Sequence, residues 1–273
     1  MKNKFRILIT LIATFIAAAF ILSGCSNETA SSKDSSSVIK SKGVVVVGLD
    51  DTFAPMGFRD EKGEVVGFDV DLAKEVFKRN NLEVKFQPID WSMKETELNT
   101  GNIDAIWNGY TITDERKEKV AFTNPYLENR QVIITLANSS IKNKNDLKGK
   151  IVAAQNESSS VDAINKEPEV VSALKNGEII LLDTNNEAFI DLEAGRIDAV
   201  VADEILARYY ITQRGVEKYS VLEDDFGKEE YGIGIRKEDK ELLADIEKAL
   251  GEMKKDGTAA EISKKWFGDN IIR

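Results

Sequence analysis

The stretch LNTGNIDAI at residues 98–106 decides the fold, because LEAGRIDAV at residues 192–200 repeats its pattern. Each copy is typical of the last turn of a helix, a glycine that ends the helix, and a short buried strand. Two copies of one helix–glycine–strand unit predict a chain built from two similar halves.

Strand and helix patterns precede each copy. In the first half, Asp69 is placed to cap a helix with an apolar stripe, and Ser92 with Glu95 fits a capping box for the helix that ends at Gly101. Alternating strands and helices give mostly parallel sheets flanked by helices, so we expect an α/β fold with two lobes. The other expected elements are strands at 44–49, 84–86, 150–154, 178–182 and 197–201, and helices at 158–164 and 187–194.

The C-terminal part predicts a return to the first lobe. A strand over 231–235 precedes a helix that Gly257 ends, and Thr258 with Glu261 fits a further capping box. A tail that covers the first lobe makes the chain cross between the lobes twice, which forms a two-strand hinge. We expect lobe 1 to comprise residues 43–130 plus 231–273, and lobe 2 to comprise residues 131–230.

The first 42 residues predict export and a lipid anchor. Lys2, Lys4 and Arg6 precede an uncharged apolar run over residues 7–21, and Leu22-Ser23-Gly24 leads directly to Cys25. This pattern is typical of a secretory signal peptide over residues 1–24, and the cysteine indicates a bacterial lipoprotein acylated at Cys25, for example with palmitate. A short transmembrane helix is the alternative, but the run is shorter than the about 20 residues that a span needs. Residues 25–42 are rich in serine, so we expect a lipidated flexible tether.

Composition excludes several classes of function. Removing residues 1–24, with their three positive charges, moves the formal net charge from −10 to −13, which disfavours nucleic acid as a partner. The chain has no histidine and one cysteine, so it has neither a disulfide framework nor a histidine-based catalytic or metal site. We expect no cofactor and no metal.

Charged residues follow the expected strands at the positions where α/β proteins bind ligands. Thr113 suits an N-cap, which places Arg116 in the first turn of a helix, where a cation opposes the helix dipole. Arg116 is either a solvated residue paired with Asp114 or Glu115, or a bidentate partner for a ligand carboxylate. Asp203 is either a simple helix cap or an acceptor for a ligand ammonium group.

Further polar and aromatic residues lie at other strand ends. The turn at residues 158–160 offers backbone N–H groups to a carboxylate, or is a serine-rich turn without function. Asp50 and Phe53 follow the first strand and are placed to contact a ligand side chain. Trp91 and Trp107 are either aromatic walls of the site or members of the core.

From residue 46 to residue 267 the sequence resembles the solute-binding proteins of polar amino-acid ABC transporters. The resemblance rests on GLDDTFAP at 48–55, GFDVDLA at 67–73, DAIWNGYTITDER at 104–116, GRIDA at 195–199 and KWFG at 265–268. It implies a periplasmic-binding-protein-like fold of type II and the capture of a free amino acid for a membrane permease.

Residue by residue, the resemblance implies one amino-acid site. Arg116 binds the α-carboxylate with backbone N–H groups of Thr111 and Ser159, and Gly109, Thr111 and Asp203 receive the α-ammonium group. Asp50, Phe53 and Trp107 face the ligand side chain, and Asn108 and Ser160 complete the predicted set. The sequence departs from the family at Phe53, where tyrosine is frequent, and at Glu157, where glycine is usual.

Two classes of function remain. The first is a monomeric lipoprotein receptor at the extracytoplasmic face of the cell membrane, which delivers a polar amino acid to ABC permease subunits. Asp50 favours a ligand with a distal cationic or ammonium group, such as arginine, lysine or cystine. Trp91, Met56 and Phe53 suit a sulfur-containing stem, so cystine or another sulfur amino acid is the alternative ligand. The second class is a dehydratase-type enzyme on the same fold, which the lack of histidine disfavours. We therefore expect a binding protein and not an enzyme.

Overall fold

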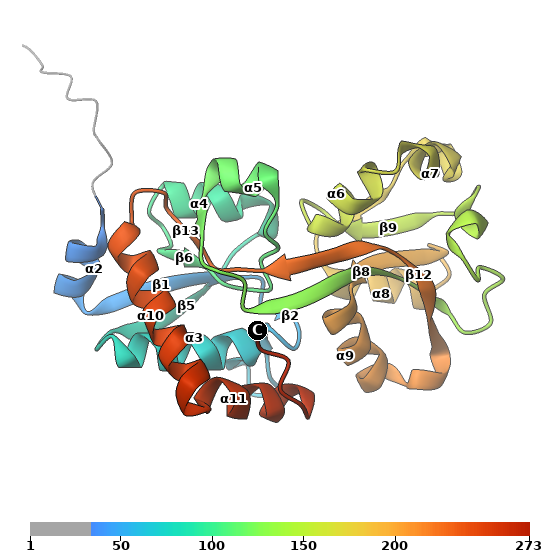
Figure 1. Cartoon of the computed structure of the whole chain (residues 1–273). Coiled ribbons are helices and arrows are strands. Elements are labelled where there is room, and N and C mark those ends of the chain that lie inside the picture. Colours follow the sequence, from blue (N-terminus) through green and yellow to red (C-terminus); the bar gives the residue numbers. More distant parts are fainter. Residues whose placement is uncertain (1–33) are drawn as a thin grey trace, which may run out of the picture. The chain divides into compact units, whose positions relative to one another are not determined.

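The computed structural model describes residues 34–273 (Figure 1). The predicted signal peptide and the predicted lipidation site at Cys25 lie outside these residues. Two five-stranded sheets organise the described part, and we call the half around each sheet the first and the second lobe. Within residues 34–273, no helix is both long and apolar enough to cross a bilayer.

The sheet of the first lobe has the strand order β5-β1-β6-β13-β7. Strand β1 is parallel to β5 and β6, whereas β13 returns from the C-terminal part and lies antiparallel to β6 and β7. The strands are β1 (Val44–Leu49), β5 (Glu83–Pro88), β6 (Ala105–Ile106), β7 (Ala121–Phe122) and β13 (Gly234–Ile235). A small sheet of β2 (Thr52–Phe53), β3 (Gly57–Arg59) and β4 (Val65–Val66) follows β1.

Helices α3 and α4 lie on opposite sides of this sheet (Figure 1). The predicted apolar stripe of α3 is confirmed, because its four residues are fully buried, namely Leu72, Ala73, Val76 and Phe77. Helices α10 and α11 pack against α3, so the C-terminal tail covers the first lobe as expected. The helices are α3 (Phe68–Arg79), α4 (Lys94–Asn99), α5 (Asp114–Lys119), α10 (Lys240–Asp256) and α11 (Thr258–Phe267), with a 3₁₀ turn at Trp91–Met93.

The sheet of the second lobe has the strand order β10-β9-β11-β8-β12. Its strands are β8 (Leu127–Leu136), β9 (Val152–Gln155), β10 (Ile180–Leu182), β11 (Ala199–Asp203) and β12 (Tyr219–Tyr231). Helices α6 and α8 lie on opposite sides of it (Figure 1). The helices are α6 (Ser159–Asn165), α7 (Pro168–Ala173), α8 (Asn185–Glu193) and α9 (Glu204–Arg214), with 3₁₀ turns at Lys144–Leu147, Lys175–Gly177 and Val216–Lys218.

The sequence repeat has the same physical basis in both lobes. Gly101 and Gly195 have φ values of +81° and +67°, which favour glycine at the end of α4 and α8. The repeated aspartate then closes a hydrogen-bonded ring with the neighbouring strand. Asp104 Oδ2 accepts from Val46 N at 2.9 Å, and Asp198 Oδ2 accepts from Ile151 N at 2.8 Å. The repeat therefore fixes the parallel strand pairing in each half.

Strands β8 and β12 carry the chain between the lobes. They pair antiparallel from Leu127 with Tyr231 to Leu136 with Tyr219, with two irregularities in register on either side of Asp225. Strand β8 follows β7 of the first sheet and β12 precedes β13 of the same sheet, so the chain crosses twice. The division of the lobes at residues 130 and 231 stays a prediction.

Three predicted helix caps are wrong. Helix α3 begins after Gly67, and Asp69 turns its carboxylate to other partners. Asp90 instead of Ser92 caps the 3₁₀ turn before α4, and Glu95 accepts from the Tyr110 hydroxyl. Helix α11 begins after Gly257 without a side-chain cap. In each case a tertiary or neighbouring partner replaces the local capping bond.

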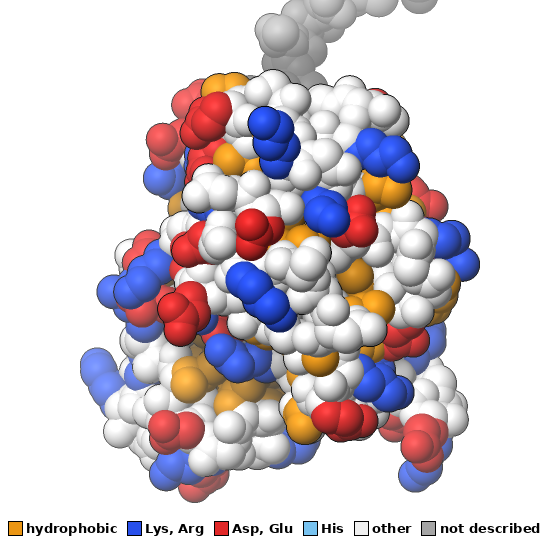
Figure 2. Space-filling view, turned by 90° about the vertical axis from the view of Figure 1, so that its right-hand side faces the viewer, with side chains coloured by type: hydrophobic (Ala, Val, Ile, Leu, Met, Phe, Trp, Pro, Cys, Tyr) orange, Lys and Arg blue, Asp and Glu red, His pale blue; other side chains and the backbone are white. Residues whose placement is uncertain are grey.

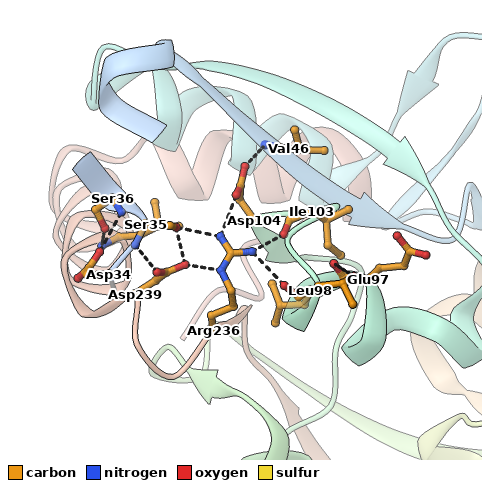
Figure 3. A network of polar contacts seen from close by, with 12 residues as sticks. Asp34, Ser35, Ser36, Val46, Glu97, Leu98, Ile103, Asp104, Arg236 and Asp239 are labelled. Atoms are coloured by element: carbon orange, nitrogen blue, oxygen red, sulfur yellow. Dashed lines mark hydrogen bonds and ion pairs between the residues drawn. The ribbon is translucent and has the colours of Figure 1, made fainter. Parts of the chain in front are cut away.

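The prediction of a flexible tether is wrong for residues 34–42. Ser36–Lys42 form helix α2, and Ile39 is buried in the core. Ser35 donates from N and Oγ to Asp239 at 2.6 and 2.8 Å, and Arg236 binds both residues and Asp104 (Figure 3). Serine here satisfies specific partners in the first lobe, so composition alone gives the wrong prediction. Residues 25–33 lie outside the described part.

Candidate functional site

Most of the ten predicted site residues lie where the two lobes meet, whereas Trp107 lies in the core of the first lobe. All ten are buried; nine follow the ends of β1, β6 and β9, and Asp203 is the last residue of β11. Several hydrogen bonds link the lobes there, and three of them involve predicted site residues of the first lobe with residues 155–159 of the second. They are Thr111 Oγ1 with Ser159 Oγ at 3.0 Å, Arg116 Nη2 to Glu157 O at 3.2 Å, and Gln155 Nε2 to Asp50 Oδ2 at 2.8 Å.

One end of the site is cationic. Thr113 caps α5 as predicted, with its hydroxyl accepting from Arg116 N, and this places the Arg116 guanidinium over the Tyr110 ring at 4.7 Å. The guanidinium donates to Thr111 O at 3.0 Å, and Arg116 is 4% exposed. Within residues 34–273 no carboxylate forms an ion pair with Arg116.

The interpretation of Arg116 as a solvated, locally paired residue is therefore wrong. Asp114 pairs with Lys117 at 3.1 Å and Glu115 pairs with Lys119 at 2.8 Å. The Arg116 guanidinium donates to carbonyl oxygens but has no carboxylate to balance its buried charge, and a hydrogen-bonded anion would balance it.

The other end of the site is anionic. Asp203 is the N-cap residue of α9, but its side chain makes no capping bond. Its Oδ1 instead accepts from Asn129 Nδ2 at 2.6 Å, Gln131 Nε2 at 3.1 Å and Tyr231 Oη at 2.6 Å. Burial, followed by the charge of Glu229, raises the pKa of Asp203 well above its usual range. The interpretation of Asp203 as a simple helix cap is wrong.

Glu229 is a member of this end that the sequence did not indicate. Its Oε1 accepts from Thr111 Oγ1 at 3.0 Å and from the same two amides that bind Asp203, Asn129 at 2.6 Å and Gln131 at 2.8 Å. Cross-strand pairing places Glu229 opposite Asn129. Only the register of β8 with β12 reveals this neighbour.

Asp50 forms a second acidic position. Its Oδ1 accepts from Thr52 N and Thr52 Oγ1, and its Oδ2 accepts from Gln155 of the second lobe. Burial raises the pKa of Asp50 from its ordinary value. Gln155 in turn accepts from Asn185 Nδ2 at 2.8 Å, so both amides, which sequence reasoning missed, extend this end of the site.

Several buried polar atoms near this acidic position have no protein partner. They are Asn185 Oδ1, Asn108 Nδ2 and Ser158 Oγ, although Asn108 Oδ1 accepts from Asp50 N at 3.0 Å. Buried polar atoms without partners are uncommon in folded proteins. These atoms are available to a polar ligand.

The backbone at Gly109 is fixed by a hydrogen bond to the buried Asp69 carboxylate. Gly109 N donates to Asp69 Oδ2 at 2.7 Å, and the residue has a φ of +56°. A Cβ atom here would lie 2.8 Å from the Phe53 ring and 3.1 Å from the Tyr231 ring, so only glycine fits. Phe53 thus packs against the Gly109 turn.

The remaining two predicted residues have structural neighbours. Trp107 lies in the core, where its ring is 6.4 Å from Phe77 and 6.3 Å from Tyr126. This placement agrees with the core alternative. Ser160 Oγ donates to Gln131 Oε1 at 2.5 Å, which orients the amide that binds Asp203.

A hollow of about 510 Å³ opens beside the site, and its size is within the range for small-molecule sites. Both lobes line it, among others through Thr111, Gln131, Ser159 and Glu229. Residues 34–273 contain no cluster of acidic or thiol ligands able to hold a metal ion. On the face drawn in Figure 2, basic and acidic side chains are interspersed without a basic patch.

Two α/β lobes with a charged site between them define a two-lobed solute-binding protein. The chain belongs to the bacterial extracellular solute-binding proteins, family 3, which matches residues 45–269. It is similar to a substrate-binding protein of an ABC uptake transporter from Streptococcus pneumoniae with bound histidine. The identity is 42%, the TM-score is 0.86, and the match covers 89% of this chain and 99% of that one.

Characterised relatives agree with this class. The L-cystine-binding protein TcyJ of Escherichia coli is 30% identical over 94% of this chain and 95% of its own length. The histidine-binding periplasmic protein of the same species is 34% identical over 82% of this chain and 88% of its own length. The expected type II periplasmic-binding-protein fold is confirmed, and the family consists of binding proteins rather than enzymes.

Proposed function

We propose that this protein binds one free polar amino acid between its lobes and delivers it to an ABC importer. The single observation that carries the proposal is the buried Arg116 guanidinium without an ion-pair partner in the described part of the chain. Opposite it lie the carboxylates of Asp203 and Glu229. An α-amino acid has the matching charges, since its carboxylate and its ammonium group are separated by one carbon. The relatives named for histidine and cystine support this class of ligand.

In this proposal, Arg116 binds the α-carboxylate with the help of backbone N–H groups at Thr111 and Ser159. The Gly109 carbonyl, the Thr111 hydroxyl and Asp203 receive the α-ammonium group. Glu229 adds a second carboxylate beside it. Thr111, Asn129 and Gln131 now hydrogen-bond these acids, and they exchange part of this network for the ligand.

The side chain of the ligand extends towards Asp50 in this proposal. Asp50 accepts hydrogen bonds, and Asn185 Oδ1 is a free acceptor beyond it. These groups favour a side chain that carries donors, such as that of arginine or lysine. L-Cystine is the second candidate, because its distal ammonium group offers a second cation to Asp50, and TcyJ supports it.

The proposal includes the setting of the protein. Cleavage before Cys25 and acylation of its thiol anchor a monomer at the extracytoplasmic face of the membrane, next to its permease subunits. The family supports the extracellular location, and the residues before Cys25 support the anchor. We expect binding without turnover.

A ligand screen tests the proposal. Thermal unfolding of residues 34–273 is measured with each of the twenty amino acids and with L-cystine, because ligands that bind the folded state raise the melting temperature. Calorimetry then gives the affinity of the best ligand for the wild type, for Arg116→Met and for Arg59→Met. Arg59 is a matched control, since its side chain is half exposed and pairs with Asp51.

We expect at least one polar amino acid to bind, and Arg116→Met to weaken it by about 3 kcal/mol or more, which is over 100-fold. Arg59→Met should bind like the wild type. If no amino acid shifts the melting temperature, the ligand class is wrong. If Arg116→Met binds as tightly as the wild type, the site is wrong.

A further inference from the structure

Lys94 is a buried lysine beside the proposed carboxylate position, and no part of the binding scheme above uses it. It is 1% exposed and lies at the start of α4 in the first lobe. Its Nζ donates to Trp91 O at 3.2 Å and to Glu157 O at 3.0 Å, and it lies 5.3 Å from the centre of the Trp91 ring. Burying an ammonium group costs hydration, so its contacts require an explanation.

Glu157 belongs to the second lobe and has an unusual backbone. Its φ is +56°, in the left-handed region that costs a non-glycine residue about 1–2 kcal/mol. Its side chain is exposed, so the glutamate itself gains little from this position. The next two residues, Ser158 and Ser159, continue this turn, and the Ser159 amide is proposed to face the carboxylate.

Two cations of the first lobe meet at this one carbonyl. Lys94 Nζ and Arg116 Nη2 both donate to Glu157 O, at 3.0 and 3.2 Å. Charge-assisted hydrogen bonds are stronger than neutral ones, and these two cross from one lobe to the other. They form only when the lobes are together, and they hold the turn in its left-handed conformation.

We propose that Lys94 is a positioning residue for the ligand carboxylate, which acts by holding the Glu157 carbonyl across the crevice. The inference rests on the proposed function, because it assumes a carboxylate at Arg116. It assigns to Lys94 two effects, a fixed turn at residues 157–159 and a second positive charge beside the bound anion.

The charge of Lys94 makes this role depend on pH. Burial, followed by the charge of Arg116, lowers the pKa of Lys94 to about 8. Glu95, at 3.5 Å, and Glu157 oppose this effect, and Asp90, Glu115 and Asp162 are the other charged groups around it. As the pH rises through about 8, Lys94 loses its proton, so the carbonyl loses a charged donor and the affinity falls.

The first test is calorimetry with L-arginine, L-histidine and L-cystine at pH 7 and pH 9, with the tightest ligand used for the variants. Lys94→Met keeps a straight side chain, and Lys78→Met is the control, since Lys78 is 79% exposed on α3. We expect Lys94→Met to weaken binding about tenfold at pH 7, as for one hydrogen bond to a charged group. The wild type and Lys78→Met should lose affinity between pH 7 and 9 more steeply than Lys94→Met.

The second test uses Glu157→Gly, which removes the backbone strain. In this background the turn needs less support, so we expect Lys94→Met to cost less than threefold in affinity and the two substitutions to be non-additive. The same cycle, measured by urea unfolding of the ligand-free protein, should show coupling of the same sign. This second measurement requires no ligand.

The outcomes separate the two proposals. If neither the three ligands nor any other amino acid of the thermal screen binds the wild type while the unfolding cycle shows coupling, the amino-acid assignment fails and the link between Lys94 and the turn stands. If the wild type binds but Lys94→Met has the same affinity and the same pH profile, the role of Lys94 is refuted. Additive effects in the unfolding cycle also refute it.

Discussion

Asp69 gives a quantitative prediction about stability. Its carboxyl group is wholly buried below the site, where it accepts from Gly109 N at 2.7 Å and from Tyr126 Oη at 2.8 Å. Burial raises the pKa of Asp69 from its ordinary value of 3.8 to about 7, although the bonds from Gly109 and Tyr126 lower it. The folded protein therefore binds a proton that the unfolded chain has released above pH 4.

The sign follows from this difference in bound protons. Between about pH 4 and pH 7 the folded state holds more protons than the unfolded chain, so the free energy of unfolding falls as the pH rises. A pKa raised from 3.8 to about 7 corresponds to a contribution of about 4 kcal/mol to the free energy of unfolding. This contribution is fully present below pH 4 and is lost by pH 7. The slope is about 1.4 kcal/mol per pH unit within this range.

Urea unfolding of the wild type and of Asp69→Asn from pH 4.5 to pH 8 measures this effect. Asparagine has one acceptor oxygen for the two donors, Gly109 N and Tyr126 Oη, so we expect a destabilisation that is the same at every pH. Because asparagine does not titrate, the pH-dependent contribution of Asp69 to the free energy of unfolding should also disappear. The difference between the two proteins should therefore change by about 3 kcal/mol over the series. Asp114→Asn is the control, because that side chain is fully exposed. Parallel stability curves for wild type and Asp69→Asn would refute the reasoning.

Two further predictions concern contacts outside the site. Arg236→Met should lower the free energy of unfolding by about 3 kcal/mol, because it leaves the Asp239 and Asp104 carboxylates without their cation. Urea unfolding measures this loss, and hydrogen exchange at residues 36–42 shows whether α2 is loosened. Wild-type protection of these residues in Arg236→Met would contradict it. Tyr209→Ala removes an aromatic contact between the lobes, since the Tyr209 and Phe58 rings are 5.6 Å apart. A loss of about 1 kcal/mol, or fivefold in ligand affinity, is expected by calorimetry, and unchanged affinity would exclude a role in closure.

Much of the fold followed from the sequence, because the elements that define it are local and repeated. The strand at 44–49 has the predicted bounds, and both copies of the repeat end a helix and begin a strand. The cap signals failed at Asp69 and Ser92, since local spacing cannot show that a buried amide or a neighbouring residue competes for the same side chain.

The positions of Asp203 at the end of β11 and of Arg116 on the helix after β6 were predictable, because each depends on one local element; their role in binding stays a prediction. Glu229 and Asn129 were not predictable, because their meeting depends on a register that shifts twice along β12. The burial of Lys94 was not predictable either, since a lysine on a short helix is most often exposed. The positions of these three residues depend on tertiary contacts that no spacing in the sequence encodes.

Helix α2 has a mechanical consequence. It is fastened through Ser35 to Asp239 and Arg236, which belong to the same lobe as β13. A force applied at residue 34 would therefore act on the first lobe and not on the half built around β9 and β11.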